Sequence, residues 1–171
     1  MRTTTHKATA RCNGLARIDP VDGYATSTSF ALESTLRAIR FDQIGGPEML
    51  RLAEAGAPVP GPREVRVKNA ACGVNFIDTY HRTGLYKVPL PSGLGLEGAG
   101  IVDAVGEGAA RFKVGDRVAY CSGPIGAYSE QHIVREDHAV ALPHAVSFEV
   151  GAASLLKGMT ARYLLRKTFR V

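Results

Sequence analysis

Residues 93–102 read Gly-Leu-Gly-Leu-Glu-Gly-Ala-Gly-Ile-Val, and this stretch decides between two fold classes. Its first six residues match Gly-x-Gly-x-x-Gly, the spacing with which a strand-turn-helix unit brings its backbone close to a dinucleotide pyrophosphate. That motif must follow a buried strand and open a helix. Here Pro89 and Pro91 precede it, and the β-branched pair Ile101 and Val102 follows it. The stretch therefore predicts a crowded corner of a β-structure, where glycine lets two backbones approach.

Segments on both sides of this corner predict a fold that is mainly β with short helices. Residues 64–68 alternate between apolar and polar side chains, as a half-buried strand does. Gly, Pro and Asp turns separate further expected strands, and the first two of these form a hairpin across residues 45–47. The expected strands are residues 36–41, 49–53, 100–105, 117–121, 127–134 and 139–142. This short spacing predicts a small antiparallel barrel.

Two other regions carry helix signals. Asn75 can cap a short helix through residue 82, with Asp78 in its first turn and Gly84 as its left-handed stop. Ser147 is expected to cap a second helix through about residue 157. Gly158 is expected to end that helix, and a third helix follows over residues 160–168.

The composition is that of a folded protein with one core. Of its 171 residues, 45% are apolar and 22% are charged, which excludes disorder and collagen-like repetition. No apolar run approaches the ~20 residues of a membrane-spanning helix, so we expect a soluble protein without a membrane partner. Cys12, Cys72 and Cys121 lie far apart and form no CxxC pair, which argues against a disulfide framework and a clustered zinc site. A reducing cytoplasm fits best, with Cys72 as a small buried residue.

The net charge of +5 comes from scattered basic residues. The densest group lies near the C-terminus and could bind nucleic acid, but cations at the end of a helix also favour the helix dipole. This group is Arg162, Arg166, Lys167 and Arg170. We prefer the second interpretation and predict no nucleic-acid partner.

Residues 1–35 differ from the rest of the chain. They hold ten Ser or Thr and four Lys or Arg, no acidic residue before Asp19, and no apolar periodicity. We expect a disordered extension there. A targeting segment is the alternative, but the stretch shows neither a sustained amphipathic stripe nor the apolar core of a secretory signal.

Three motifs taken together resemble the medium-chain dehydrogenase/reductase superfamily: residues 71–80 (ACGVNFIDTY), 93–102 (GLGLEGAGIV) and 114–118 (VGDRV). Residues 82–86 (RTGLY) and 155–168, which include LLKGMT and YLLRKT, look like its zeta-crystallin-like branch, the NADPH:quinone oxidoreductases. The resemblance implies a GroES-like β-barrel, the alcohol-dehydrogenase-like N-terminal catalytic domain, over residues 36–146. It also implies hydride transfer from NADPH to a quinone or enone.

The resemblance separates this chain from the zinc enzymes of the superfamily. Those enzymes hold a catalytic ion with a Cys where Asn75 stands and a His where Leu96 stands. An amide and an alkyl group cannot replace a thiolate and an imidazole, so we expect a site without zinc and with no metal-binding residues. Glu97 keeps the acidic position of the zinc site, and we expect it to accept hydrogen bonds from backbone groups or an Arg.

Without a metal, the oxyanion formed by hydride transfer must be stabilised by hydrogen-bond donors. The resemblance implies Asn75, Tyr80 and Tyr86 as these catalytic donors. It implies that NADPH contacts a second set of residues: Phe76, Ile77, Asp78, Thr79, Tyr80 and Tyr163. A purely structural interpretation stays open, in which Tyr80 and Tyr86 are half-buried rings, and Asn75 and Asp78 serve only the helix cap.

Members of this family continue past the position of Val171 into a doubly wound nucleotide-binding domain, and we expect this Rossmann domain to be missing here. Residues 147–171 are expected to be helices leading toward it. Without its phosphate-binding turn the chain should bind NADPH weakly or not at all. A separate nucleotide-binding half or a homo-oligomer could cover the apolar side chains that these helices leave exposed: Leu155, Leu156, Leu164, Leu165 and Phe169. The alternative function is a noncatalytic GroES-like barrel that acts as a protein-interaction module.

Overall fold

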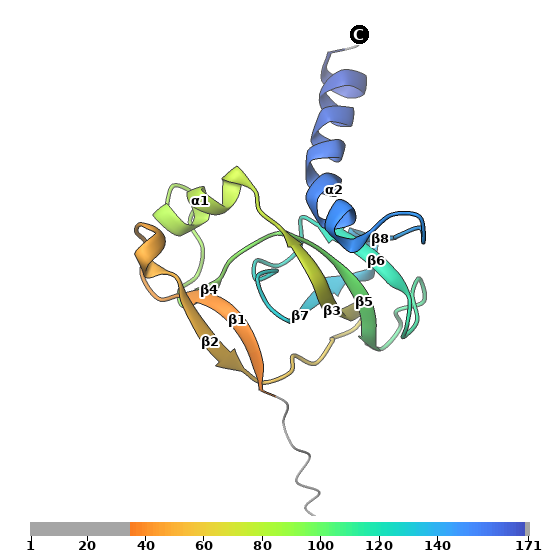
Figure 1. Ribbon diagram of the computed structural model, residues 1–171, viewed down its shortest axis with the longest axis horizontal. Coiled ribbons are helices and arrows are strands. Elements are labelled where there is room, and N and C mark those ends of the chain that lie inside the picture. Colours follow the sequence, from red (N-terminus) through yellow and green to blue (C-terminus); the bar gives the residue numbers. More distant parts are fainter. Residues whose placement is uncertain (1–34, 170–171) are drawn as a thin grey trace, which may run out of the picture. The chain divides into compact units, whose positions relative to one another are not determined.

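The computed structural model describes residues 35–169, which contain two antiparallel sheets, helical segments and the turns and loops that connect them (Figure 1). The three-stranded sheet has the order β2-β1-β4, and the five-stranded sheet has the order β7-β3-β5-β6-β8. The strands of the first sheet are β1 (Leu36–Phe41), β2 (Arg51–Ala55) and β4 (Ser92–Gly93). Those of the second are β3 (Glu64–Gly73), β5 (Glu97–Val105), β6 (Arg117–Cys121), β7 (Gln131–Arg135) and β8 (Ala139–Ala141).

Helical segments connect and follow these strands. Two are α-helices, α1 (Phe76–Thr83) and α2 (Phe148–Tyr163). Two are single 3-10 turns, η1 (Pro47–Met49) and η2 (Glu136–His138), and a π-helical turn, η3 (Leu164–Thr168), continues from α2. The mainly β architecture with short helices is as the sequence predicts. The expected disorder of residues 1–35 lies outside the described residues, except for residue 35.

The barrel expected from the strand spacing is not closed by hydrogen bonding. The two sheets are linked through an isolated bridge between Ala38 and Ser129 and through neighbouring backbone bonds, such as Ile39 N–H to the Tyr128 carbonyl at 2.8 Å. β4 pairs with β1 over only two residues, and residues 127–130 form no strand, so the contact between the two sheets is too short for a ladder. The expected strand at residues 127–134 begins only at Gln131, because Ala127 and Tyr128 donate to the carbonyls of Gly95 and Leu94.

The glycine-rich stretch forms a strand-to-strand corner and opens no helix. Gly93 ends β4, Gly95 has a φ of +92°, and Gly98 lies in β5 opposite Tyr120. A Cβ on Gly98 would lie 2.5 Å from the Tyr120 hydroxyl, so only glycine fits without displacing that ring. This confirms the structural interpretation of the motif, although β5 begins at Glu97, three residues before the predicted start.

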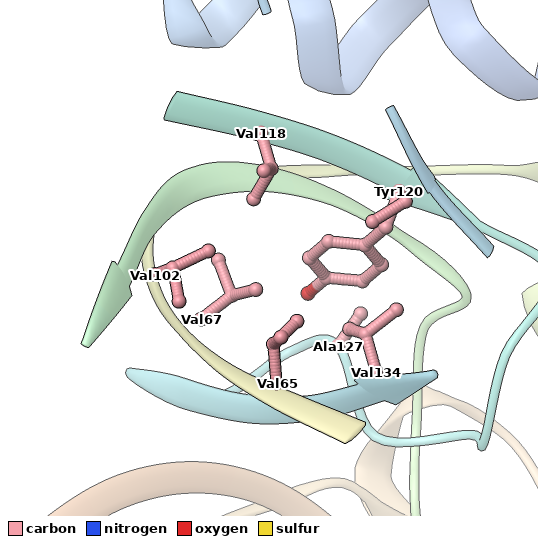
Figure 2. Close-up of a cluster of buried hydrophobic side chains, with 8 residues drawn as sticks. Val65, Val67, Val102, Val118, Tyr120, Ala127 and Val134 are labelled. Atoms are coloured by element: carbon pink, nitrogen blue, oxygen red, sulfur yellow. The ribbon is translucent and has the colours of Figure 1, made fainter. Parts of the chain in front are cut away.

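The main core lies on the inner face of the five-stranded sheet. Val65 and Val67 are fully buried and alternate along β3 with more exposed residues, as the sequence pattern predicts. In Figure 2 the Tyr120 ring points into a cluster of valines from neighbouring strands. The whole cluster is Val65, Val67, Val102, Val118, Tyr120, Ala127, Val134 and Ala139.

A second, smaller core holds the first turns of α2 on the other face of this sheet. Ala152 of α2 packs with Ala99 of β5, Ala119 of β6 and Leu142, and Leu155 is partly buried against them. From Lys157 onward the described side chains of α2 and η3 are exposed, and Figure 1 shows these turns extending beyond the sheets. The prediction that Gly158 ends the helix is wrong. A glycine in a helix interior costs only ~1 kcal/mol relative to alanine, and the intact hydrogen-bond ladder outweighs that cost.

Candidate functional site

The site begins at α1, whose ends are set by local sequence signals. Asn75 is the N-cap, with extended backbone angles, and the Asp78 carboxylate accepts the Asn75 backbone N–H at 2.9 Å as part of a capping box. Gly84 ends the helix in the left-handed conformation, with a φ of +82°. These are the cap and the stop predicted from the sequence. They fix the direction in which the side chains of the next residues point.

Three rings gather along α1 and the turn after it, and we call them the aromatic cluster: Phe76, Tyr80 and Tyr86. The Tyr80 ring lies edge-on to Phe76, with centroids 5.2 Å apart, and 5.3 Å from the Tyr86 ring. Phe76 is 74% exposed and Tyr86 is 49% exposed. The cluster therefore presents an apolar surface with two phenol groups to solvent, on which a planar ring could stack.

A network of charged and amide groups, which we call the polar junction, joins α1, β5 and α2. It consists of Asn75, Glu97 and Lys157. The Asn75 Nδ2 donates to Glu97 Oε2 at 2.8 Å, and its Oδ1 accepts from Lys157 Nζ at 2.8 Å. Lys157 Nζ also lies 3.3 Å from Glu97 Oε2. Both sides of the Asn75 amide are thus fixed by partners from other elements.

Glu97 is completely buried, and its partners correct the sequence prediction in part. Its Oε1 accepts the backbone N–H of Leu156 at 2.7 Å, so the expected backbone donor exists. The cationic donor, however, is Lys157 and not an Arg. A buried carboxylate needs a cation and hydrogen bonds to offset the loss of water, and α2 delivers both.

Close packing of α2 against β3 brings these groups together. Gly73, the last residue of β3, pairs with Glu97. A Cβ on Gly73 would lie 2.1 Å from the Ala152 carbonyl oxygen and 2.6 Å from Glu97 Oε2. Glycine at this position is therefore what allows α2 to sit close enough for Lys157 to reach Glu97.

The other residues expected to contact the cofactor are divided between α1 and α2. Ile77 and Thr79 are half-buried on α1, and the Thr79 hydroxyl donates to the Phe76 carbonyl at 2.7 Å. Tyr163 lies far along α2, 60% exposed, and none of the hydrogen bonds found among residues 35–169 involves its hydroxyl. The structure thus groups Asn75, Phe76, Tyr80 and Tyr86 and places Tyr163 on a separate element.

Asp78 faces inward. It is 3% exposed, and the Tyr128 hydroxyl donates to its Oδ2 at 2.6 Å. Burial, together with the hydrogen bond and charge of Asp78, raises the pKa of Tyr128 above its usual range. Asp78 is engaged in holding α1 to the loop before β7.

Among residues 35–169, the cysteines and the other potential metal ligands form no cluster. Cys72 is exposed, so the prediction that it is buried is wrong, although its thiol donates to the Ala127 carbonyl at 2.8 Å. Cys121 is buried opposite Glu97 in the β5–β6 ladder, and burial raises the pKa of its thiol. Within residues 35–169, no three His, Cys, Asp or Glu side chains are placed to hold a metal ion. No helix in that part of the chain is long and apolar enough to cross a bilayer.

Comparison with known proteins agrees with this architecture. Residues 61–144 match the alcohol dehydrogenase GroES-like domain. Together with the two-sheet fold, this match defines the class: a GroES-like domain of the alcohol dehydrogenase type.

Similar sequences and structures give the family. The quinone oxidoreductase of Pseudomonas aeruginosa is 57% identical over 136 residues, which are 79% of this chain and 42% of that protein. Quinone oxidoreductase 1 of Escherichia coli is 53% identical over 134 residues, 78% of this chain and 41% of that protein. The crystal structure of Escherichia coli quinone oxidoreductase complexed with NADPH superposes with a TM-score of 0.78 at 52% identity, over 79% of this chain and 42% of that one. The chain belongs to the quinone oxidoreductase family of the medium-chain dehydrogenase/reductase superfamily, and it spans about two fifths of the length of these relatives.

Sequence reasoning missed Lys157 as a site residue. Lys157 is separated from Glu97 by 60 residues, and no local pattern connects them. One signal was available: Lys157 interrupts an otherwise apolar stretch, between Leu156 and Met159, with a charge. A charge at such a position draws attention to a partner, because charged residues are seldom buried unless they are paired.

Proposed function

We propose that this chain is the N-terminal catalytic portion of an NADPH-dependent quinone oxidoreductase, which reduces a quinone or related enone. The observation that carries the proposal is the exposed aromatic cluster beside Asn75, in a chain 52% identical to a relative whose structure holds NADPH. A flat quinone or nicotinamide ring needs an apolar surface to stack on and polar groups at its edge. The aromatic cluster and the polar junction supply these two features.

The described residues fit the nicotinamide end of NADPH better than its phosphate end. Phe76 and Tyr80 offer exposed or partly exposed ring surface at the start of α1, and Tyr163 offers another on α2. The glycine-rich stretch opens strand β5, so it does not provide the helix N-terminus that holds a pyrophosphate. When bound, NADPH would supply the hydride. The chain alone is expected to bind it weakly or not at all.

The reduced substrate carries a negative oxygen, and three side chains are candidates to stabilise it. Asn75, Tyr80 and Tyr86 bear amide or phenol donors at or beside α1. A preorganised donor of this kind contributes ~2.7–4 kcal/mol to the stability of a transition state. Asn75 is the most firmly oriented of the three, because two other side chains hold its amide.

The proposed reaction needs no zinc. The positions that bear Cys and His in zinc enzymes of the superfamily hold the Asn75 amide and the Leu96 alkyl group. The Lys157 ammonium, 2.8 Å from Asn75 Oδ1, would repel a divalent cation at this place. We place the reaction in a reducing cytoplasm, because the two described cysteines are free.

The test is reconstitution of the nucleotide-binding part. The chain is joined to, or mixed with, the C-terminal portion of the Pseudomonas aeruginosa quinone oxidoreductase, and NADPH oxidation is followed at 340 nm with a quinone and a zinc chelator present. Activity that requires both parts, and that Asn75→Ala or Tyr80→Phe reduces at least about tenfold, supports the proposal. A folded assembly without activity refutes it.

A second candidate function rests on α2 and η3. Met159, Leu164, Leu165 and Phe169 are each about half or more exposed, with Phe169 at 77%. Apolar side chains gathered in this way are typical of an interaction surface. A noncatalytic protein-interaction module would form a defined complex, measured by light scattering, with a partner that has no nucleotide-binding domain. A separate nucleotide-binding half or a second copy of the chain is the partner expected under the catalytic proposal.

A further inference from the structure

In the polar junction, the ammonium group of Lys157 has more hydrogen-bond donors than Asn75 and Glu97 engage. Lys157 Nζ makes two hydrogen bonds, to Asn75 Oδ1 and to Glu97 Oε2. An ammonium has three N–H donors, so one remains. The Lys157 side chain is 52% exposed, whereas that of Glu97 is fully buried. The charge is therefore anchored on its inner side and open to solvent on its outer side.

We propose that Lys157 is a further catalytic residue, which binds the anionic oxygen of the reduced substrate and protonates it. This inference rests on the proposed function and adds a charged donor to the neutral donors named there. Hydrogen bonds from an ionised donor to an anion are shorter and roughly twice as strong as those between neutral groups. The Asn75 and Glu97 contacts hold the ammonium in place before substrate arrives, which is the condition for stabilising a charge that develops during reaction.

The same contacts explain why the charge stays at this position. The Glu97 carboxylate is also held by the Leu156 N–H and by Asn75 Nδ2, so it remains fixed whether or not a ligand engages Lys157. Asn75 is at the same time the first residue of the turn that carries Phe76. A planar substrate on the aromatic cluster would thus lie next to the residue that Lys157 contacts.

The proton step balances with the substrate and water alone once a hydride has been delivered. A quinone that has accepted a hydride is a hydroquinone monoanion. An N–H bond of the Lys157 ammonium breaks, its electron pair stays on nitrogen, and an O–H bond forms on the anionic oxygen. The neutral amine regains a proton from water through its exposed side.

The test measures binding of an anionic phenol by the chain itself, with no cofactor. The probes are 4-nitrophenolate, at a pH where it is ionised, and 4-nitroanisole, which has the same ring without the negative oxygen; binding is followed by absorbance. We expect tighter binding of the phenolate than of the anisole. Lys157→Met should weaken phenolate binding about tenfold, which corresponds to about 1.4 kcal/mol, and leave anisole binding unchanged.

Three further variants guard against a loss of folding. Lys113→Met removes an exposed lysine of the loop before β6 and should change neither affinity. Lys157→Arg keeps the charge and should keep the preference for phenolate. The double variant Lys157→Met with Glu97→Gln leaves no buried charge unpaired and should still lose the preference while keeping a native circular dichroism spectrum.

The outcomes separate this proposal from the proposed function. Equal phenolate affinity in the wild type and in folded Lys157→Met overturns the role of Lys157, and so does a wild type that does not distinguish the two probes. If phenolate binding depends on Lys157 but the reconstituted protein does not oxidise NADPH, the anion site stands and the quinone oxidoreductase assignment falls.

Discussion

His132 makes the stability of this domain depend on pH in a way that can be calculated. The ring is 7% exposed on β7, stacks on Tyr120 with centroids 5.5 Å apart, and places Nε2 3.0 Å from the Pro124 carbonyl oxygen. Burial lowers the pKa of His132 to about 4, although the Pro124 contact opposes the change. In the unfolded chain the pKa of a histidine is about 6.5. At pH values between these two pKa values, His132 carries a proton in the unfolded state but not in the native state.

The sign follows from this difference in bound protons. The native state keeps His132 neutral, so the free energy of unfolding is highest above about pH 6.5 and falls as the pH drops toward 4. Between about pH 7 and pH 5 the loss from this one group is on the order of 2 kcal/mol. The lowered pKa values of the exposed carboxylates, such as Asp42 and Glu130, affect stability mainly at lower pH.

The assay is urea denaturation of the wild type and of His132→Gln, which has no titrating group at this position, at several pH values in that range. The variant is expected to be less stable at neutral pH, and the difference should shrink by about 2 kcal/mol as the pH falls to about 5. Contributions from the other histidines cancel in the comparison. If the two stability curves run parallel from pH 7 to pH 5, the buried, neutral state of His132 is refuted.

Three substitutions test the packing described above, each by its urea midpoint. Gly100→Ala would place a Cβ 2.0 Å from the Lys68 carbonyl oxygen. It should lower the free energy of unfolding by about 1–3 kcal/mol or more, because the β3–β5 ladder must open. An unchanged free energy of unfolding would contradict this close approach. Gly158→Ala has no neighbouring atom within 4 Å and should stabilise α2 by about 0.5–1 kcal/mol, seen as a rise in helical circular dichroism; a loss of helix would contradict a continuous α2. Tyr120→Phe removes the hydroxyl that donates to Asn69 Oδ1 at 2.9 Å and should lower the free energy of unfolding by about 1 kcal/mol. An unchanged urea midpoint would show that this hydrogen bond does not stabilise the fold.

Features set by neighbouring residues were predictable from the sequence. The strand at residues 117–121 and the first strand at 36–41 have the predicted bounds, because each is a short run rich in apolar residues that turn residues bound locally. The cap at Asn75 and the stop at Gly84 were predicted for the same reason. The glycine-rich stretch was correctly assigned to a strand corner, since the residues on either side of it exclude a helix.

Relations between distant segments were not predictable in the same way. Whether Gly158 ends a helix depends on the balance between a small local cost and the hydrogen bonds of the whole of α2, and only the folded chain settles that balance. The failure of the two sheets to close into a barrel depends on how few residues of β1 and of the segment 127–130 pair across the two sheets. Neither the stability of α2 nor the pairing between the two sheets can be predicted from one segment of the sequence.

The candidate site likewise contains local features, which the sequence predicts, and contacts between distant segments, which it does not. Local sequence signals alone place a helix start at Asn75, with Phe76 and Tyr80 on that helix, since caps and glycine stops act over only a few residues. Only the tertiary structure brought Lys157 to Glu97, across 60 residues of chain. A buried carboxylate requires a cationic partner, but which cation meets it is decided by the packing of α2 on β3 and β5.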